Sequence, residues 1–185
     1  FTPLVELFSI DEAFLDVTGC ESLIGDPVQI AVRLKNEIWQ ITGLTCSVGI
    51  ARNKLLAKLG SDMLKPDGIV LISPGDEQEV LEDLPVKELC GIGPSLTQQL
   101  SAMGIRTCGE LGRTPLAKLT ARFGILGERL RDMGQGIDDD PVGSDAADHL
   151  GQNGRRRLHR RAQLAISRVA KDRAARLHLG HARDG

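Results

Sequence analysis

The sequence has no run of about 18 apolar residues, the length that a membrane-spanning helix requires. Its N-terminus also lacks the basic stretch, apolar stretch and cleavage site of a secretory signal. These two absences predict a cytoplasmic protein without a membrane partner. The four cysteines stand far apart and form no C-x-x-C pair, so we interpret them as reduced thiols of the core: Cys20, Cys46, Cys90 and Cys108.

Charge is distributed unevenly along the 185 residues. Residues 1–150 contain 13 lysines and arginines against 23 acidic residues, whereas residues 151–185 contain 10 against 2. The basic C-terminal segment indicates a polyanion as a partner. Because the net charge of the whole chain is −2, nucleic-acid binding by the acidic part must depend on local groups rather than on a global field.

The first part of the chain alternates between predicted strands and helices. Two short apolar runs, at residues 5–10 and 13–17, predict a hairpin. Asp26 as N-cap and Pro27 as first residue predict an amphipathic helix that ends at Gly43. A strand over 44–51, a helix capped by Asn53 and a strand over 69–72 follow. Strands that interleave with helices favour an α/β sandwich with helices packed on a sheet.

From Ser73 onward the pattern changes to helices alone, separated by glycines and prolines. We place a domain boundary near residues 73–76. Beyond Val142 the apolar periodicity thins, all four histidines of the chain occur, and arginines cluster in "RRRLHRR". The sequence thus divides into regions 1–75, 76–142 and 143–185.

Two adjacent carboxylates, Asp11 and Glu12, lie at the expected hairpin turn. Neighbouring residues of a strand point to opposite faces, so both acids serve one centre only where the backbone turns. Carboxylate oxygens are ligands for Mg²⁺, which commonly shares them with substrate phosphates. The alternative is an ordinary solvated acidic turn.

Lysines and glycines farther along the chain supply candidate phosphate contacts. Lys54 and Lys58 are four residues apart on one helix, and Lys65 lies in the "KPDG" turn, where it could act as a point charge on a triphosphate. The alternative is a solvated helix face with an ordinary turn lysine.

A Gly-Ile-Gly turn, Gly91 to Gly93, precedes a helix that begins at Pro94. This pattern predicts that the amides of Gly91, Ile92 and Gly93, with the helix N-terminus, bind a phosphate without a cationic side chain. A simple glycine-rich connection between helices is the alternative.

Taken together, these segments resemble a known family. Ser9-Ile10-Asp11-Glu12-Ala13, then "SVGIARNKLLAKLGSDMLKPDG", then "LPVKELCGIGPSLTQQLSAMGIRTCGEL" and finally "GIDDDPV" follow one another in an order and spacing similar to those of a Y-family translesion DNA polymerase of the bacterial DNA polymerase IV (DinB) type. The resemblance covers residues 5–142.

The resemblance implies an α+β fold: a ferredoxin-like polymerase palm, partial, over residues 1–75, and an all-helical thumb with a helix-hairpin-helix over 76–142. Asp11 and Glu12 would be the catalytic, metal-binding acids beside Ser9, and Lys65 would contact the triphosphate. The DNA backbone would be held by Gly91, Ile92, Gly93 and Pro94.

The implied reaction is transfer of a deoxynucleotide to a primer 3′ end with release of pyrophosphate, in translesion synthesis and DNA repair. The implied cofactor is Mg²⁺, as two ions for which Mn²⁺ can substitute, and the partners are primer-template DNA, deoxynucleoside triphosphates and a sliding clamp.

The sequence also departs from the family. Members begin with a strand that supplies another aspartate to the metal centre, followed by a fingers region that supplies Tyr and Arg; this chain starts at Phe1 and contains no tyrosine. We therefore expect the chain alone to have little or no polymerase activity. After Val142 the lysine-serine-aliphatic-glycine motif that leads into a little-finger domain is absent. We interpret residues 143–185 as a disordered or non-native tail, with a DNA-binding arm as the alternative, and expect a helix over Ala162–Leu179.

Other functions remain open beside the polymerase. A non-catalytic DNA-binding module derived from such a polymerase is the main alternative, and retention of Asp11 and Glu12 argues for the enzyme. A helix-hairpin-helix scaffold for protein partners would expose a large apolar patch. A nuclease built on paired acids would favour more carboxylates or a histidine near the hairpin, and residues 1–75 contain no histidine.

Overall fold

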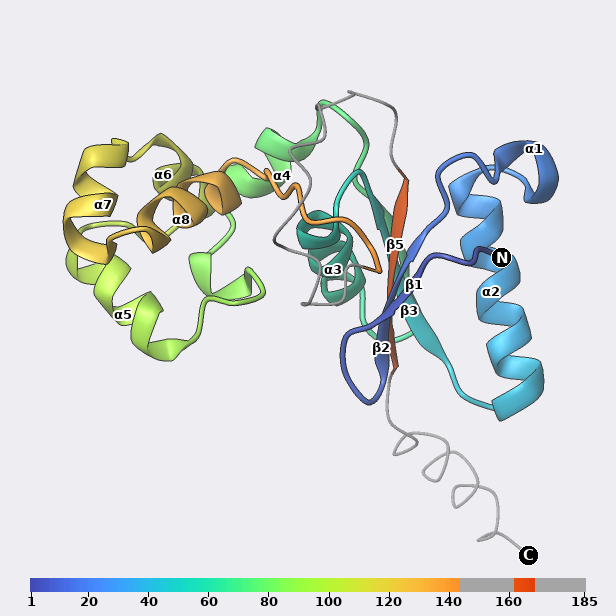
Figure 1. The fold of residues 1–185 in the computed structure, drawn as a ribbon. Coiled ribbons are helices and arrows are strands. Elements are labelled where there is room, and N and C mark those ends of the chain that lie inside the picture. The colour runs from blue at the N-terminus through green and yellow to red at the C-terminus, as the bar shows by residue number, and fades with distance from the viewer. Residues whose placement is uncertain (144–161, 169–185) are drawn as a thin grey trace, which may run out of the picture.

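The computed structural model describes residues 1–143 and 162–168, which form one mixed sheet with helices on both faces and a separate group of short helices (Figure 1). This arrangement confirms the α+β class. The hairpin and the alternation of strands and helices are also confirmed. The elements of the sheet region, residues 1–75, are β1 (Val5–Leu7), β2 (Glu12–Asp16), α1 (Glu21–Ile24), α2 (Pro27–Thr42), β3 (Cys46–Ala51), α3 (Lys54–Met63) and β4 (Ile69–Leu71).

The caps of α2 form as the sequence indicates. The Asp26 carboxylate accepts hydrogen bonds from the amides of Val28 and Gln29, and the Gln29 side chain accepts one from the Asp26 amide, which completes a capping box. At the other end Gly43 adopts the left-handed conformation with φ of 66°. Short-range signals therefore define the length of this helix.

The sheet has the order β1-β2-β5-β3-β4, and its central strand comes from the C-terminal segment. This strand, β5 (Gln163–Arg168), pairs antiparallel with both β2 and β3, whereas β3 and β4 are parallel. The helix expected over Ala162–Leu179 is therefore wrong for the strand residues, and the expected disordered tail does not hold for them. Leu164 and Ala165 are buried in the sheet, a tertiary gain that overrides the modest helix preference of an Ala/Leu-containing segment. Residues 144–161 and 169–185, with the arginine cluster, lie outside the described residues.

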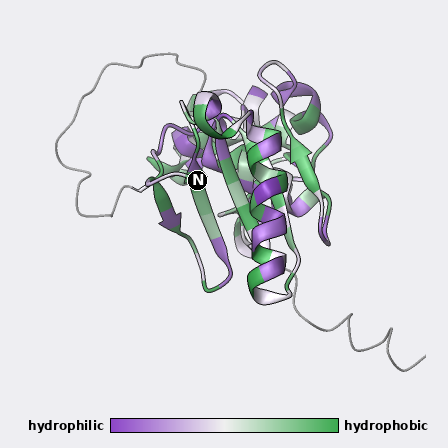
Figure 2. Ribbon diagram, turned by 90° about the vertical axis from the view of Figure 1, so that its right-hand side faces the viewer, coloured by the Kyte–Doolittle hydropathy of each residue, from purple (hydrophilic) through white to green (hydrophobic). Residues whose placement is uncertain are grey.

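The two faces of the sheet have different helical covers. Helix α2 packs on one face through Ile30, Ala31 and Leu34. Figure 2 looks from this side and shows hydrophobic and hydrophilic residues alternating along α2. Helix α3 covers the other face and approaches β3 so closely that the α-carbon of Gly49 lies 3.2 Å from a β-carbon built on Gly60. Helix α3 thus lies between the sheet and the short helices (Figure 1).

The helical region, residues 76–142, contains short helices as predicted. They are α4 (Glu77–Glu82), the 3₁₀ turn η1 (Val86–Glu88), α5 (Pro94–Ala102), α6 (Cys108–Arg113), α7 (Leu116–Phe123) and α8 (Leu126–Gly134). Among residues 1–143 and 162–168, no helix combines the length and apolarity that a bilayer crossing requires.

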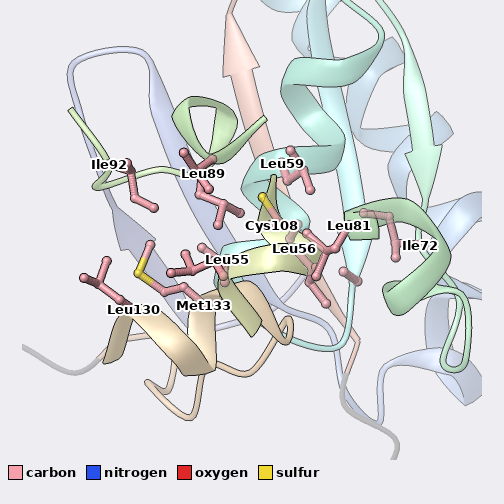
Figure 3. Packing of buried hydrophobic residues seen from close by; sticks show 14 of the residues in the cluster. Leu55, Leu56, Leu59, Ile72, Leu81, Leu89, Ile92, Cys108, Leu130 and Met133 are labelled. Carbon is pink, nitrogen blue, oxygen red and sulfur yellow. The ribbon is translucent and has the colours of Figure 1, made fainter. Parts of the chain in front are cut away.

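One hydrophobic cluster spans both regions. Leu55, Leu56 and Leu59 of α3 pack with helical-region residues such as Leu81 and Leu130 (Figure 3). The boundary predicted near residues 73–76 therefore marks a change of secondary structure within a shared core. This packing fixes α3 against both the sheet and the helical region.

Asn53 joins the two regions through a buried side chain. Its Oδ1 accepts a hydrogen bond from the Leu56 amide (3.0 Å) and its Nδ2 donates to the Gly136 carbonyl (2.8 Å). Replacing Asn53 with Ala removes the cap of α3 and leaves a buried carbonyl unpaired, so we expect a loss of about 1–3 kcal/mol in the free energy of unfolding. Urea denaturation measures this loss. The exposed Asn36→Ala on α2 is the control and should not destabilise, because alanine favours helix; equal stabilities of the two variants would contradict the prediction.

Candidate functional site

The hairpin between β1 and β2 presents Asp11 at its exposed tip. The Ser9 hydroxyl donates to Asp11 Oδ1 at 3.1 Å, and the amides of Phe8 and Ser9 both donate to the Glu12 carbonyl. The Phe8 and Phe14 rings meet edge to face with centroids 5.3 Å apart. These contacts fold the loop back on itself and place Asp11 directly before the first residue of β2.

Glu12 opens β2 and its side chain faces α3. Lys58 Nζ lies 3.1 Å from Glu12 Oε1, and the Ser167 hydroxyl of the central strand donates to the same oxygen at 3.3 Å. The side chains of Lys58 and Glu12 are 11% and 18% exposed, so this ion pair is largely shielded from water. Glu12 is thus held by a cation from the helix and a hydroxyl from the neighbouring strand.

Asp62 connects this pair to Lys65. Its Oδ2 lies 2.6 Å from Lys58 Nζ and its Oδ1 lies 2.6 Å from Lys65 Nζ. Burial by itself would lower the pKa of Lys58, but hydrogen bonds to Asp62 and Glu12 raise that pKa above its ordinary value. Burial would likewise raise the pKa of Asp62, and the two lysine hydrogen bonds bring it below its usual range. Lys58 and Asp62, the middle members of the series Glu12-Lys58-Asp62-Lys65, are therefore both charged at neutral pH.

A cavity of about 440 Å³ lies between the hairpin, α3 and α8. Phe8, Phe14, Lys54 and Lys58 line it from the sheet region, and its other walls include Cys90, Glu128, Arg129, Met133 and Asp138. Burial raises the pKa of Asp138, while the amides of Asp140 and Leu55, which donate to its carboxylate, oppose that rise. The cavity therefore opens beside the charged series and has wall residues from both regions.

The glycine turn follows Cys90 on the cavity wall. Gly91 has a φ of 97°, and within the described residues the amides of Gly91 and Gly93 have no hydrogen-bond acceptor. The Ile92 amide instead donates to the Leu89 carbonyl at 3.0 Å, and its side chain is buried in the core. Ile92 thus differs from the sequence expectation, because its amide is already used within the turn. A groove beside this turn is lined by Ile92 and Pro94 together with Lys87, Thr97, Gln98 and Ser101.

The fold links two of the site residues that the sequence analysis selected, Glu12 and Lys65, through Lys58 and Asp62. Asp11 contacts Ser9 rather than this series, and the cavity beside Lys58 reaches the glycine turn only as far as Cys90, the residue before it. Sequence reasoning missed Asp62, although its spacing of four residues from Lys58 and three from Lys65 would have indicated helix-surface pairs. It also missed Ser167, for which no local signal exists.

The carboxylates present suit one divalent cation better than two. Asp11 and Glu12 are hard oxygen donors at a turn, and Mg²⁺ is commonly held by one or two carboxylates together with substrate phosphates. In the part of the chain that the structure describes, no group of three or more His, Cys, Asp or Glu side chains is arranged to hold a metal. Two carboxylates are the donor set for one Mg²⁺ ion shared with phosphate oxygens, although Glu12 is paired with Lys58 in this structure, and Asp11 and Glu12 do not make up a complete two-ion centre among the described residues.

Comparisons with known proteins bear on both regions. Residues 1–62 match the model of the impB/mucB/samB family. Residues 87–138 match the model described as DNA polymerase-iota, thumb domain. The first match covers the hairpin, α2 and most of α3, and the second covers the glycine turn and the helices that follow it.

Curated relatives extend the similarity. DNA polymerase IV of Moorella thermoacetica is 41% identical over 187 aligned residues, which cover 97% of this chain and 47% of that protein, so this alignment continues beyond residue 142. DNA polymerase IV of Pelotomaculum thermopropionicum is 48% identical over 142 residues, which cover 77% of this chain and 35% of that protein. The chain thus spans less than half the length of these two relatives.

Solved structures show the same similarity in three dimensions. DinB from Sulfolobus solfataricus is 32% identical with a TM-score of 0.67, over 76% of this chain and 42% of that one. The insertion ternary complex of Dbh DNA polymerase gives a TM-score of 0.68 at the same identity, over 76% of this chain and 42% of that one. With the acidic hairpin, the lysine turn and the glycine turn in the family's order, the chain belongs to the Y family of DNA polymerases and is of the DinB type.

Proposed function

We propose that this chain is the palm and thumb part of a DNA-directed DNA polymerase that performs template-directed nucleotidyl transfer in translesion synthesis. The observation that carries this proposal is the charged series from Glu12 to Lys65, whose member Lys58 lines a cavity together with Cys90. Cys90 directly precedes a turn in which two amides have no acceptor among the described residues. Phosphoryl transfer depends mainly on positioning and charge neutralisation, and these groups are suited to both tasks.

The nucleotide side of the site consists of the acids and one lysine. Lys65 is exposed at the surface beyond α3, where its ammonium can meet a triphosphate as a compact point charge. Asp11 and Glu12 would hold Mg²⁺ together with phosphate oxygens, and the ion would supply neutralisation of the developing charge. A second ion, Mn²⁺ as a substitute and a sliding clamp remain predictions from the family resemblance, and a cytoplasmic location remains a prediction from the sequence.

The DNA side consists of backbone groups. The amides of Gly91 and Gly93, which have no acceptor within residues 1–143 and 162–168, precede a helix of nine residues, and the N-terminus of a helix favours an anion. Contacts of this kind bind phosphates irrespective of base identity, as a polymerase requires. Lys87 beside the groove adds one positive side chain.

A pair of variants separates the two sides. Lys65→Met should weaken binding of the templated nucleotide to the complex with primer-template DNA about 10-fold and leave DNA affinity unchanged. Gly93→Glu should weaken DNA affinity about 10-fold through repulsion between its carboxylate and the phosphate. DNA affinity is measured by fluorescence anisotropy of a labelled primer-template, and nucleotide binding by titration of dNTP with Mg²⁺ into that complex.

Two control variants separate the effect of the charge in Gly93→Glu from the effects of side-chain size and of position in the fold. Gly93→Gln has nearly the same size as Gly93→Glu without its charge, and a β-carbon added at position 93 meets no atom within 4 Å. Gln40→Glu adds the same charge on α2, across the sheet from the helical region (Figure 1). If Gln40→Glu lowers DNA affinity as much as Gly93→Glu, the assignment of the glycine turn is wrong. If the templated nucleotide has no effect on the wild-type complex, the polymerase assignment is wrong.

A non-catalytic DNA-binding module is the second candidate. Two observations favour it. Lys58 and Ser167 already contact the carboxylate of Glu12, and among residues 1–143 and 162–168 no three metal-ligating side chains come together. Both candidates predict little or no primer extension by this chain alone in Mg²⁺. They differ in nucleotide binding, because the module should bind DNA without discriminating the templated dNTP.

A further inference from the structure

Asp62 occupies a central place between the two predicted ligand-binding groups. One of its carboxylate oxygens pairs with the Lys58 ammonium and the other pairs with the Lys65 ammonium, and Lys58 in turn contacts Glu12. Charges alternate along the series, so the position of each member depends on its neighbours. Lys58 and Asp62 thus connect Glu12 to Lys65 by direct contacts.

The two ends of the series differ in exposure. Lys58 and Glu12 are mostly buried, whereas the side chains of Asp62 and Lys65 are 36% and 37% exposed. An ion pair exposed to water contributes little to stability, so a highly charged phosphate can displace the Asp62 carboxylate from the Lys65 ammonium. The shielded inner pair is opened less easily, and it changes when the charge of Glu12 is neutralised.

We propose that Asp62 is a positioning residue that couples the charge state of Glu12 to the availability of Lys65 for a triphosphate. Neutralising Glu12, by a cation or by substitution, leaves Lys58 with Asp62 as its only carboxylate partner among the described residues. Lys58 then draws Asp62 away from Lys65, whose ammonium becomes free for phosphate. Conversely, phosphate bound at Lys65 leaves Asp62 to Lys58 and frees Glu12 for a cation. The inference rests on the proposed function, because it takes Lys65 as the phosphate contact.

Metal-free binding of inorganic triphosphate tests the coupling in the full chain. In EDTA, Asp62→Asn should bind inorganic triphosphate about 5-fold more tightly than wild type in titration calorimetry, because Lys65 loses its competitor. Glu12→Gln should tighten binding similarly in the wild-type background and have no further effect in the Asp62→Asn background. Lys58→Met, which breaks the series at another member, should also abolish the effect of Glu12→Gln.

Asp67→Asn is the matched control. It removes the same charge two residues from Lys65, but Asp67 pairs with Lys35 rather than with the series. Asparagine accepts the φ of 68° at this position. Asp62→Asn and Asp67→Asn with equal affinities would show a mere change in net charge, and weaker binding by Asp62→Asn would show a purely structural role. Either result, or an effect of Glu12→Gln that persists without Asp62, overturns the proposal.

Mg²⁺ alone provides the second readout. The ¹⁵N signal of the Lys65 ammonium should shift when Mg²⁺ is added to wild type and stay in place in Asp62→Asn, while Lys58 responds in both. Equal Lys65 responses in the two proteins would contradict the coupling. If Mg²⁺ leaves the hairpin signals of both proteins unmoved, the proposed metal role of Asp11 and Glu12 fails, and the metal-free titrations still decide the role of Asp62.

Discussion

A chain shortened to end at Gly143 should lose the cooperative unfolding transition of its sheet, because it lacks β5. This strand pairs with β2 over five residue pairs and with β3 over six, and among the strands that the structure describes no other joins the two halves of the sheet. Leu164 and Ala165 would leave a gap between α2 and α3, and two unpaired edges would face each other. We expect the free energy of unfolding to fall by about 5 kcal/mol or more, a large part of the stability of a domain.

A chain that ends at Arg168 is the matched control, since it keeps β5 and omits only residues 169–185. Urea unfolding followed by circular dichroism compares the two chains. The longer one should unfold as the full chain does, and a peptide of residues 161–169 should restore the transition of the shorter one. A chain ending at Gly143 with the stability of the full chain would show that β5 is dispensable.

Replacing Gly49 with alanine should cost about 3 kcal/mol or more, because this glycine lies where α3 touches the sheet. A β-carbon at position 49 would lie 1.9 Å from the Ala57 carbonyl oxygen and 2.4 Å from the Ser61 amide nitrogen. Both atoms belong to the backbone, so α3 as a whole must move. Because Lys58 and Asp62 are on that helix, their contacts with Glu12 and Lys65 should weaken at the same time.

Thermal unfolding measures the loss, and Gly93→Ala is the control. Position 93 has a φ of −78° and no atom within 4 Å of an added β-carbon, so alanine there should leave the melting temperature nearly unchanged. If the two alanine variants melt together, the helix and strand are farther apart in solution than in the structure. If Gly49→Ala loses stability but keeps triphosphate binding, the position of α3 does not control the site.

The sequence was informative wherever a structural signal fits within a few residues. The hairpin around Asp11, the capped start of α2 at Asp26 and the cap of α3 at Asn53 all form as expected. Each depends on local hydrogen bonds or on apolar periodicity, which a single segment contains. The same locality explains the glycine turn, although the use of the Ile92 amide within that turn was not predictable from residue type.

The residues alone thus determined a sheet covered by helices, the acidic hairpin, the two capped helices and the lysine and glycine turns, and the family resemblance added the α+β class. Tertiary structure alone decided that Gln163–Arg168 is the central strand, that Lys58 pairs with Glu12, and that one core spans both regions. The physical reason is sequence distance: Ser167 and Glu12 are 155 residues apart, and a strand with little local preference takes its conformation from the partners on either side.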